Sequence, residues 1–412
     1  MKVVRIFFIL VFTLILWLAV RQYLFCPQFT FVKGKPFSGN QLYNPYAGID
    51  SGEWVKCNFH AHTHAWKGLT NGRGTATDVW RCYDSLGYGV HSVSDYHKIN
   101  DAFSDKENYI PAYEHGYNMT KTHQLVLGDK QVKWLDYIFP QTLSNKQYIL
   151  NQLSEDAGNV VILNHPSVRN GFTEDDLHYL SNYDCVEVLN PWAFSFKHWD
   201  AALSAGKPVF IVGDDDSHDV SLSSIGKCCT RVNVSSVNCK NVLTALKKGE
   251  SYGMRIAKIP GEQIEERIQR LKYDLPGLKK FSVAGDTIQL AITKMAKQIQ
   301  IIGQNGKILQ VSDAVSNVVY VMQQQDNYVR AAITFEDGTE IFLNPVFRYS
   351  GTSILEKTGP VINSDKTLLF FISGLIIFSA WCAYVITFLF GKLLWKRRRE
   401  ELLQESPLPT LG

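Results

Sequence analysis

Histidines alternate in the stretch Cys57-Asn58-Phe59-His60-Ala61-His62-Thr63-His64, where an apolar run ends. Because alternate side chains of a β-strand share a face, His60 and His62 can point at one place in space, and His64 can join them. Neutral imidazole is the commonest protein ligand of zinc and its neighbours, so two such rings supply half of a four-coordinate shell. The pattern therefore indicates a metal site, and a histidine cluster without metal is the alternative.

Further groups of histidine and acidic residues follow later apolar runs. In chain order they are Ser94-Asp95-Tyr96-His97, Tyr113-Glu114-His115, His123, Asn164-His165-Pro166 and Asp214-Asp215-Asp216-Ser217-His218. Each group lies where a buried strand would end in a loop, and barrel enzymes keep their catalytic groups at such strand ends. The recurrence strengthens the interpretation of the first stretch as part of a site.

The composition narrows the class of protein. A chain of 412 residues with 45% hydrophobic residues can bury a large core and form more than one domain. The net charge of +3 gives no electrostatic case for nucleic-acid binding. The eight cysteines lack the paired spacing of a structural zinc site. Cys228, Cys229 and Cys239 could include a disulfide in an exported domain, with free buried thiols as the equal alternative.

An apolar segment stands near each end of the chain. Ile6 to Val20 lies between Arg5 and Arg21, and no small-x-small cleavage site follows it. We therefore expect an uncleaved membrane anchor over residues 1–25 rather than a signal peptide. Leu368 to Phe390 carries no charge and is long enough to cross a bilayer, with a buried helical hairpin as the alternative.

Basic residues lie on the outer side of each apolar segment. Lys2 and Arg5 flank the first, and Lys392, Lys396, Arg397, Arg398 and Arg399 follow the second. By the positive-inside rule, both termini are predicted to be cytoplasmic. Everything between the two segments is then expected on the extracytoplasmic side of the membrane.

Short apolar runs alternate with helical stretches from Trp54 to Arg255, which predicts an α/β region with a parallel, barrel-like sheet. The predicted strands are Gly89 to Ser94, Gln124 to Gly128, Val160 to Asn164, Cys185 to Leu189 and Pro208 to Gly213. The predicted helices are Ala76 to Leu86, Asn145 to Ala157 and His198 to Ala205.

The pattern changes after a predicted connecting helix, Ile264 to Leu271. Two hairpin signals, Asn305-Gly306 and Asp337-Gly338, lie between alternating segments from Phe281 to Tyr349 and predict a small β-sandwich. The predicted parts are an N-terminal anchor (1–25), a barrel (54–255), a connecting helix with a β-sandwich (256–350), a transmembrane helix (368–390) and a basic cytoplasmic tail (391–412).

Together the motifs resemble those of the PHP family, which is named after polymerase and histidinol phosphatase. The motifs that carry the resemblance are His60-x-His62-Thr63, Ser94-Asp95, Glu114, His123, His165-Pro166, Glu187 and Asp216-x-His218. A trailing β region with Tyr328-Val329-Arg330 and Asn344-Pro345 also resembles the tail of some PHP phosphoesterases. The resemblance covers about residues 54 to 255. It implies a distorted β/α barrel with two or three metal ions at the C-terminal ends of its strands.

The resemblance assigns a set of residues to the metal site: His60, His62, Glu114, His123, His165, Asp216 and His218. In the family pattern, His60 and His62 bind the first metal and Glu114 bridges metals. Such a mixture of nitrogen and oxygen donors suits zinc, manganese or iron. Glu187 is expected to support a ligand rather than to bind metal itself.

Two departures from the family pattern fall on ligands of the second or third metal. The family's Ser-Asp-Gly segment has its nearest match in Thr70-Asn71-Gly72, which carries a neutral amide and a longer spacing. The family's Thr-Asp-His is here Ser94-Asp95-Tyr96-His97, so the histidine is displaced by one position or replaced by Tyr96. The number of ions therefore stays open between a full trinuclear centre and one with fewer ions.

The chemistry that the resemblance implies is metal-assisted hydrolysis of a phosphoester. Asp95 or His97 is the candidate for protonating the leaving group or orienting water, with a structural or ligand role as the alternative. Arg73, Lys98 and Arg169 are candidate contacts to the phosphate, with solvated surface charge as the alternative.

The sequence thus predicts a membrane-anchored metal-dependent phosphoesterase that acts on a small-molecule or envelope-polymer phosphoester. A nucleic-acid partner is not expected. Two alternatives stay open. One is a non-catalytic envelope-binding module that keeps a metal for stability, and the other is a hydrolase of a non-phosphate bond that uses the same centre.

Overall fold

The computed structural model describes residues 2–49, 53–219, 221, 225–351, 354–355 and 359–405. The chain forms two compact units. The first unit combines Met1–Thr30, Tyr137–Asn145 and Ile362–Gly412, and the second combines Phe31–Asp136 and Lys146–Val361. The end of the predicted basic tail, from residue 406 onwards, lies outside the described residues.

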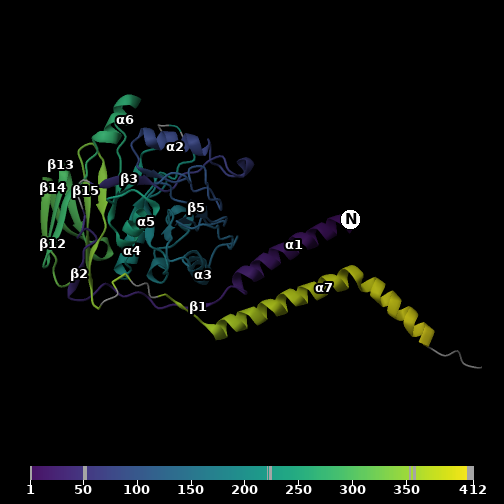
Figure 1. Cartoon of the computed structure of the whole chain (residues 1–412). Coiled ribbons are helices and arrows are strands. Elements are labelled where there is room, and N and C mark those ends of the chain that lie inside the picture. The colour runs from purple at the N-terminus through teal and green to yellow at the C-terminus, as the bar shows by residue number, and fades with distance from the viewer. Residues whose placement is uncertain are drawn as a thin grey trace, which may run out of the picture. The chain divides into compact units, whose positions relative to one another are not determined.

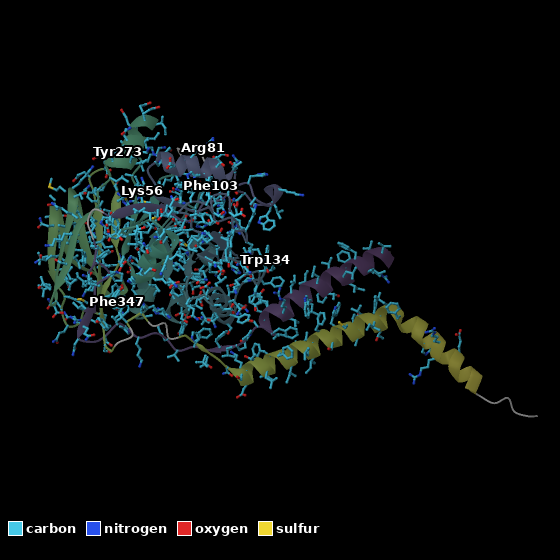
Figure 2. All side chains as sticks on the ribbon, viewed as in Figure 1. Lys56, Arg81, Phe103, Trp134, Tyr273 and Phe347 are labelled. Atoms are coloured by element: carbon cyan, nitrogen blue, oxygen red, sulfur yellow. The ribbon has the colours of Figure 1, made fainter. Side chains whose placement is uncertain are left out.

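The first unit contains two long apolar helices, α1 (Lys2–Tyr23) and α7 (Ser364–Glu405). Their spans Val3–Tyr23 and Ser364–Gly391 are each long and apolar enough to cross a membrane. Side chains stand out along both helices (Figure 2), and most of the large apolar ones are exposed. Because a helix that is hydrophobic all round is either buried in protein or spans a membrane, these helices are candidate membrane spans.

Side chains of the two apolar helices contact each other inside this unit. The indole of Trp381 donates a 2.9 Å hydrogen bond to Thr13 Oγ1, and its ring lies 4.6 Å from that of Phe12. The end of α1 also binds the segment Tyr137–Asn145 from the middle of the chain. Gln22 Nε2 donates to the Phe139 carbonyl, and the Phe139 N–H donates back to Gln22 Oε1, both at 2.9 Å.

The second unit contains a five-stranded sheet whose strands are almost completely buried. Its order is β5 (Ala112–His115), β6 (Gln124–Leu127), β7 (Val160–Leu163), β8 (Cys185–Leu189) and β9 (Phe210–Gly213). The pairs β5/β6 and β6/β7 are antiparallel, whereas β7/β8 and β8/β9 are parallel. Burial of both faces explains why these segments read as continuous apolar runs in the sequence.

The second sheet of this unit has eleven strands. Its main path is β12 (Leu278–Ala284), β13 (Thr287–Ile302), β15 (Tyr328–Thr334), β16 (Glu340–Leu343), β11 (Ser251–Arg255), β10 (Cys228–Asn233), β3 (Trp54–Asn58) and β4 (Val90–His91). Off this path are β14 (Ile308–Val321), β17 (Val346–Tyr349) and β2 (Gln41–Tyr43). The remaining strands of the described residues are the short strands β1 (Phe29–Thr30) and β18 (Val361–Ile362), which do not belong to this sheet.

Helices connect the strands of the second unit. They are α2 (Ala76–Ser85), α3 (Leu143–Leu153), α4 (Phe196–Ser204), α5 (Cys239–Lys248) and α6 (Ile264–Tyr273), with the short 3-10 turns η1 (Trp66–Gly68), η2 (Val168–Asn170), η3 (Asp176–His178) and η4 (Gln304–Gly306). The sequence fixes their ends locally. Thr75 and Asp78 form a capping box at the start of α2, and Gly249 ends α5 in the left-handed conformation.

The expected α/β architecture is present as a mixture of helices and several sheets, but no continuous ladder closes a barrel among the described residues. Two isolated parallel bridges, Ala61 to Ser217 and Tyr96 to Glu114, link segments of the chain instead. The predicted strands and helices of this region all overlap an observed element. The sequence did not predict β5 or β10, nor the antiparallel direction of β5 and β6.

The predicted β-sandwich strands are found, but they continue a sheet that begins in the α/β region. β16 pairs with β11 from Tyr252 and Leu343 to Arg255 and Glu340. Figure 1 shows β12, β13 and β14 together at one side of the unit and β5 at the other. The predicted boundary at residue 255 stays a prediction, because one sheet runs across it.

Candidate metal centre

The two alternating histidines lie just beyond the end of β3, and both are buried. The chain remains extended there because the His62 N–H donates to the Ser217 carbonyl at 2.8 Å and the Ala61 N–H donates to Ser94 Oγ at 3.1 Å. As alternation predicts, the two rings face one place, with 3.1 Å between their Nε2 atoms. This pair forms one wall of the centre.

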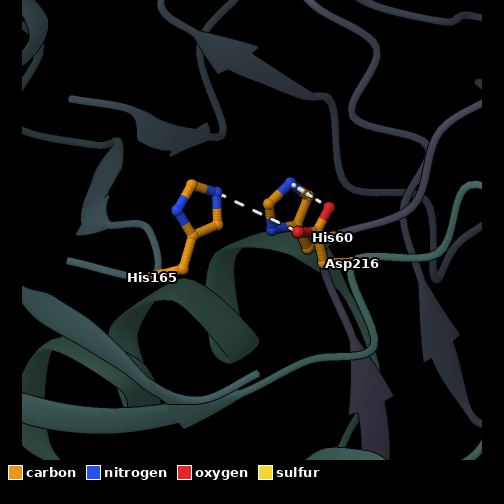
Figure 3. A group of neighbouring side chains, drawn as sticks. All are labelled: His60, His165 and Asp216. Carbon is orange, nitrogen blue, oxygen red and sulfur yellow. Dashed lines mark ion pairs between the residues drawn. The ribbon is translucent and has the colours of Figure 1, made fainter. Parts of the chain in front are cut away.

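Two carboxylates complete the middle of the centre. Glu114 comes from β5, and its Oε2 lies 3.4 Å from His60 Nε2 and 3.2 Å from His62 Nε2. Asp216 follows β9, and its Oδ1 lies 3.3 Å from His60 Nε2 and 3.4 Å from His62 Nε2. Figure 3 shows His60, Asp216 and His165 turned toward one another. Each carboxylate therefore faces both imidazoles.

Three more predicted histidines join this arrangement. His123 Nδ1 lies 2.7 Å from Glu114 Oε1, and His165 Nε2 lies 3.3 Å from the same oxygen. His218 Nε2 lies 3.4 Å from Asp216 Oδ1. The structure thus brings together all the residues that the resemblance assigns to the metal site.

The donor atoms fit divalent metal ions. They fall into four groups, each with its ligand atoms within 4.8 Å of one another: His60, His165 and Asp216; His60, His62 and Glu114; His62, Asp216 and His218; Glu114, His123 and His165. Glu114 Oε2 and Asp216 Oδ1 are buried, and neither accepts a hydrogen bond of good geometry within the described chain, although imidazole nitrogens lie 3.2–3.4 Å from each. Such orphaned oxygens are costly, and a cation that fills the space between them and the imidazoles removes the cost.

The electrostatics of these groups also suit a cation. Burial opposes protonation of His60, but Asp216, Glu187 and Glu114 outweigh it and raise its pKa well above the ordinary value. Burial likewise favours the neutral form of Glu114, yet His123 and His60 outweigh it and hold the pKa of that carboxyl well below the ordinary value. The carboxylates thus attract positive charge, which protons supply when no metal is bound.

Polar groups behind the ligands fix their orientation. Glu187 on β8 lies 3.0 Å from His60 Nδ1 through Oε1 and accepts the His165 N–H at 2.8 Å through Oε2. Asn164 Nδ2 donates to Glu114 Oε1 at 3.1 Å, and Asn190 Nδ2 donates to Asp216 Oδ2 at 3.2 Å. The sequence analysis gave Glu187 this supporting role, whereas it overlooked the two asparagines. Their position in the sequence could have indicated this role, because each is the first residue after a buried strand.

Two of the candidate ligands have a strained backbone. His165 and Asp216 have φ values of 26° and 44°, in the left-handed region that non-glycine residues rarely adopt. Such conformations cost about 1–3 kcal/mol each and tend to persist at functional sites. The strain turns both side chains into the centre instead of along the direction of their strands.

The two predicted catalytic residues do not join the four metal-binding groups found among the described residues. Asp95 accepts the Thr63 N–H and the Thr63 hydroxyl, both at 2.7 Å, and so holds the loop that follows His62. His97 Nε2 accepts the Gly116 N–H at 2.9 Å, and its ring stacks on Trp134 with centroids 5.4 Å apart. Burial lowers the pKa of His97 to about 3, which suits this acceptor role and does not suit a general acid at neutral pH.

Tyr96 occupies the place beside the imidazoles that His97 leaves. Its ring stacks on His62 with centroids 4.7 Å apart and planes at 17°, and it lies 5.5 Å from the ring of His123. The structure therefore puts Tyr96, and not His97, beside two of the candidate ligands. Lys121, which the sequence analysis overlooked, places its Nζ 5.5 Å from the Tyr96 ring centroid.

The predicted phosphate contacts Arg73, Lys98 and Arg169 are all exposed. Only backbone contacts link the first two to site loops: the Arg73 N–H donates to the His218 carbonyl at 3.0 Å, and the Lys98 N–H donates to the Asp95 carbonyl at 3.1 Å. Asn71 is also exposed and belongs to none of the four groups found in the described chain. The substrate roles of the three cations stay predictions.

No family model matches the sequence, and no curated protein matches it. Among solved structures, the chain is similar to a two-domain protein from Bacteroides vulgatus ATCC 8482 that contains a predicted PHP-like metal-dependent phosphoesterase. The identity is 12% and the TM-score 0.36, over 74% of this chain and 95% of that one. It is also similar to PsfC from Pseudomonas syringae PB-5123, with 14% identity and a TM-score of 0.36 over 53% of this chain and 96% of that one. Likenesses with such TM-scores carry no argument about activity, which rests on the side chains described above.

Proposed function

We propose that this chain is a membrane-anchored, metal-dependent hydrolase of the PHP type that acts on phosphoesters. The observation that carries the proposal is the pair of orphaned buried oxygens, Glu114 Oε2 and Asp216 Oδ1, each within 3.4 Å of two imidazole nitrogens. Such a pair is not expected in a packed core that binds no ligand, because an unsatisfied buried carboxylate oxygen destabilises the fold.

Divalent ions held there would supply an activated water and offset the negative charge that develops on an ester under attack. The chain's own contribution is to hold the ligands in place. Glu187 orients the ring of His60 and the backbone of His165, while Asn164 and Asn190 orient the two carboxylates. Ligands fixed in this way need little rearrangement when metal and substrate bind.

The fold that goes with this proposal is the distorted PHP barrel followed by a small β domain. The bridges from Ala61 to Ser217 and from Tyr96 to Glu114 support it, because each links a segment that follows a strand of the large sheet to β5 or to the segment that follows β9 in the five-stranded sheet. Both bridges lie at the centre itself. A barrel that closes there would gather its strand ends around the metal ligands.

Metal content and phosphate release test the proposal in the full chain, purified in detergent. We expect two or three zinc, manganese or iron ions per chain and metal-dependent release of phosphate from a phosphoester. His62→Ala and Asp216→Ala should lose metal and activity, and His178→Ala, a half-buried histidine away from the centre, should keep both. Full activity in both site variants would sink the proposed site.

The binding-module alternative draws on one observation. Tyr96 stands where a metal-binding histidine would be, so the centre has fewer ligands than the family pattern supplies. One ion or none after metal supplementation, with no turnover of any ester, would favour that module. Turnover of carboxylic esters in preference to phosphoesters would favour the broader hydrolase.

The membrane part of the proposal places both termini in the cytoplasm and the catalytic unit on the extracytoplasmic side. It is supported by the two apolar spans and by the basic residues on their outer sides. Protease added to intact spheroplasts should digest the region between the helices. Protection until the cells are lysed would contradict this orientation.

A further inference from the structure

A lysine that the proposed mechanism does not yet use stands beside the metal centre. Lys121 lies in the turn between β5 and β6, and its Nζ is 5.5 Å from the centroid of the Tyr96 ring. That ring stacks on His62 at 4.7 Å and lies 5.5 Å from His123. One aromatic ring therefore separates the ammonium group from two candidate metal ligands, and an ammonium this close to a ring face is attracted to it.

The turn holds Lys121 in a strained conformation. Its φ of 59° lies in the left-handed region, which costs a non-glycine residue about 1–2 kcal/mol. Several bonds enforce it: Asn118 Oδ1 accepts the Thr122 N–H at 2.8 Å, Asn118 Nδ2 donates to the Thr122 carbonyl at 3.0 Å, and Thr122 Oγ1 donates to the Gly171 carbonyl at 3.0 Å. Strain that several contacts maintain next to a site points to a functional position.

The charge of Lys121 has no counter-ion in the described part of the chain. Glu114 of the centre directs its Oε1 to His123 and its Oε2 to His62. Lys121 itself is half-buried, so water screens its charge only in part. A half-buried ammonium beside divalent ions is unfavourable unless an anion lies between them, because like charges repel strongly at short range in a partly dry site.

We propose that Lys121, seated on the ring of Tyr96, binds a phosphoryl oxygen of the substrate, and that the substrate is a phosphomonoester. This inference rests on the proposed hydrolase and narrows its substrate class. A monoester carries up to two negative charges on its phosphoryl oxygens near neutral pH. A cation supplied in addition to the metal ions complements the second of these charges. A phosphodiester has only the first charge, and a carboxylic ester has neither.

Lys121→Met tests this role, because it removes the charge and keeps most of the length of the side chain. A hydrogen bond to a charged group is worth about 1.5–3 kcal/mol, so we expect kcat/KM for p-nitrophenyl phosphate to fall about 10- to 100-fold, mainly through KM. The fall for bis(p-nitrophenyl) phosphate should be smaller, and any turnover of p-nitrophenyl acetate should not change. Lys121→Arg should recover part of the loss. Lys130→Met, an exposed lysine beyond the end of β6, is the matched control.

Binding of inorganic phosphate gives a readout that needs no turnover. By calorimetry with the metal-loaded full chain, Lys121→Met should weaken phosphate binding by a similar factor at unchanged metal content. Tyr96→Leu, which removes the aromatic seat, should weaken it less, and Tyr96→Phe should leave it near the parent value because the ring remains.

Three outcomes would overturn the role of Lys121: equal losses for all three esters, loss of metal from Lys121→Met, or phosphate binding that does not respond to the change. Failure of the proposed function looks different. A parent protein that hydrolyses no ester but binds phosphate through Lys121 would refute the enzyme and keep the anion site.

Discussion

Two of the places where the second unit buries charge are built in opposite ways. At the first, Arg330 on β15 and Asp200 on α4 form a paired ion bridge, with Nε donating to Oδ1 at 3.0 Å and Nη2 donating to Oδ2 at 2.9 Å. The Tyr328 hydroxyl adds a third bond to Asp200, and the guanidinium lies 4.8 Å from the ring of Trp199. Both carboxylate oxygens have partners, and neither Arg330 nor Asp200 has a positive φ.

The metal centre shows the reverse. Glu114 Oε2 and Asp216 Oδ1 have no hydrogen-bond partner, and Asp216 and His165 are held at positive φ. Burial of charge is therefore not what marks a functional site, because both places have it. The metal centre differs in that two of its buried carboxylate oxygens lack a hydrogen-bond partner among the described residues and two of its residues have a strained backbone, which a stable fold tolerates when a ligand removes the cost.

The largest expected effect separates the two places by activity. Glu114→Ala removes the carboxylate that faces His60, His62, His123 and His165, so metal should be lost and kcat/KM for a phosphoester should fall at least about 1000-fold. Asp200→Asn should keep the metal and most of the activity. Elemental analysis and steady-state kinetics on both variants measure the contrast, and equal losses of activity would erase it.

The next effect separates them by stability. Arg330→Met leaves Asp200 buried without its cation, and breaking a buried pair in this way costs about 3–5 kcal/mol. Denaturant unfolding should show this loss. The double variant Asp200→Leu with Arg330→Met should recover most of it, because two apolar side chains leave no buried charge. A stable single variant would mean that the pair does not hold α4 to the sheet.

Metal removal should distinguish the metal centre from the Arg330–Asp200 pair through a smaller effect, on the melting temperature. A ligand present at 100 times its dissociation constant stabilises the folded state by about 2.7 kcal/mol, so a chelator should lower the melting temperature of the parent. Glu114→Ala should not respond to chelator, whereas Arg330→Met should respond as the parent does. Calorimetric scans with and without chelator measure the gap.

The difference in melting temperature between the scans with and without chelator should increase as pH rises. Without metal, the pKa values of His60, His62 and His165 are raised because, although burial opposes protonation, nearby carboxylates outweigh it. The stability that protonation gives the metal-free protein is complete below the ordinary histidine pKa of about 6.5 and is lost as pH rises through the raised values. Metal binding needs neutral imidazole rings, so the affinity for metal increases over the same pH range. A gap that shrinks from pH 6 to pH 8 would contradict this assignment.

Much of the site could be predicted because its residues follow buried strands. Apolar runs predict the strands, and a strand end indicates where the next polar side chains emerge. His60, His62 and Asp216 lie beyond such strand ends, whereas Glu114 lies inside β5, which the sequence did not predict. The structure brings these four side chains together. Long-range pairing was not predictable. Arg255 lies opposite Glu340 across an antiparallel pair, and no local pattern encodes a partner so far along the chain.

The predicted role of Asp95 and His97 shows where alternation fails. On an extended strand the two side chains would share a face. The φ of 48° at His97 breaks the alternation, so its ring turns to Gly116 and Trp134 while Tyr96 faces the metal ligands. A single left-handed residue is enough to exchange the faces of its neighbours, and the sequence holds no glycine there to announce it.

The smallest expected effect belongs to His97. Burial lowers the pKa of His97 to about 3, so its ring stays neutral throughout the working range. The neutral ring accepts a hydrogen bond from the Gly116 N–H. His97→Gln can still accept that bond, so kcat/KM should change less than about 3-fold, and the acidic limb of the pH profile should not move. In ring-nitrogen NMR spectra of the metal-free protein, the His97 signal should show no titration between pH 5 and 8, where the raised histidines of the centre gain and lose protons. A shifted acidic limb in the variant would return His97 to the role of proton donor and would extend the catalytic site beyond the four groups of candidate ligands.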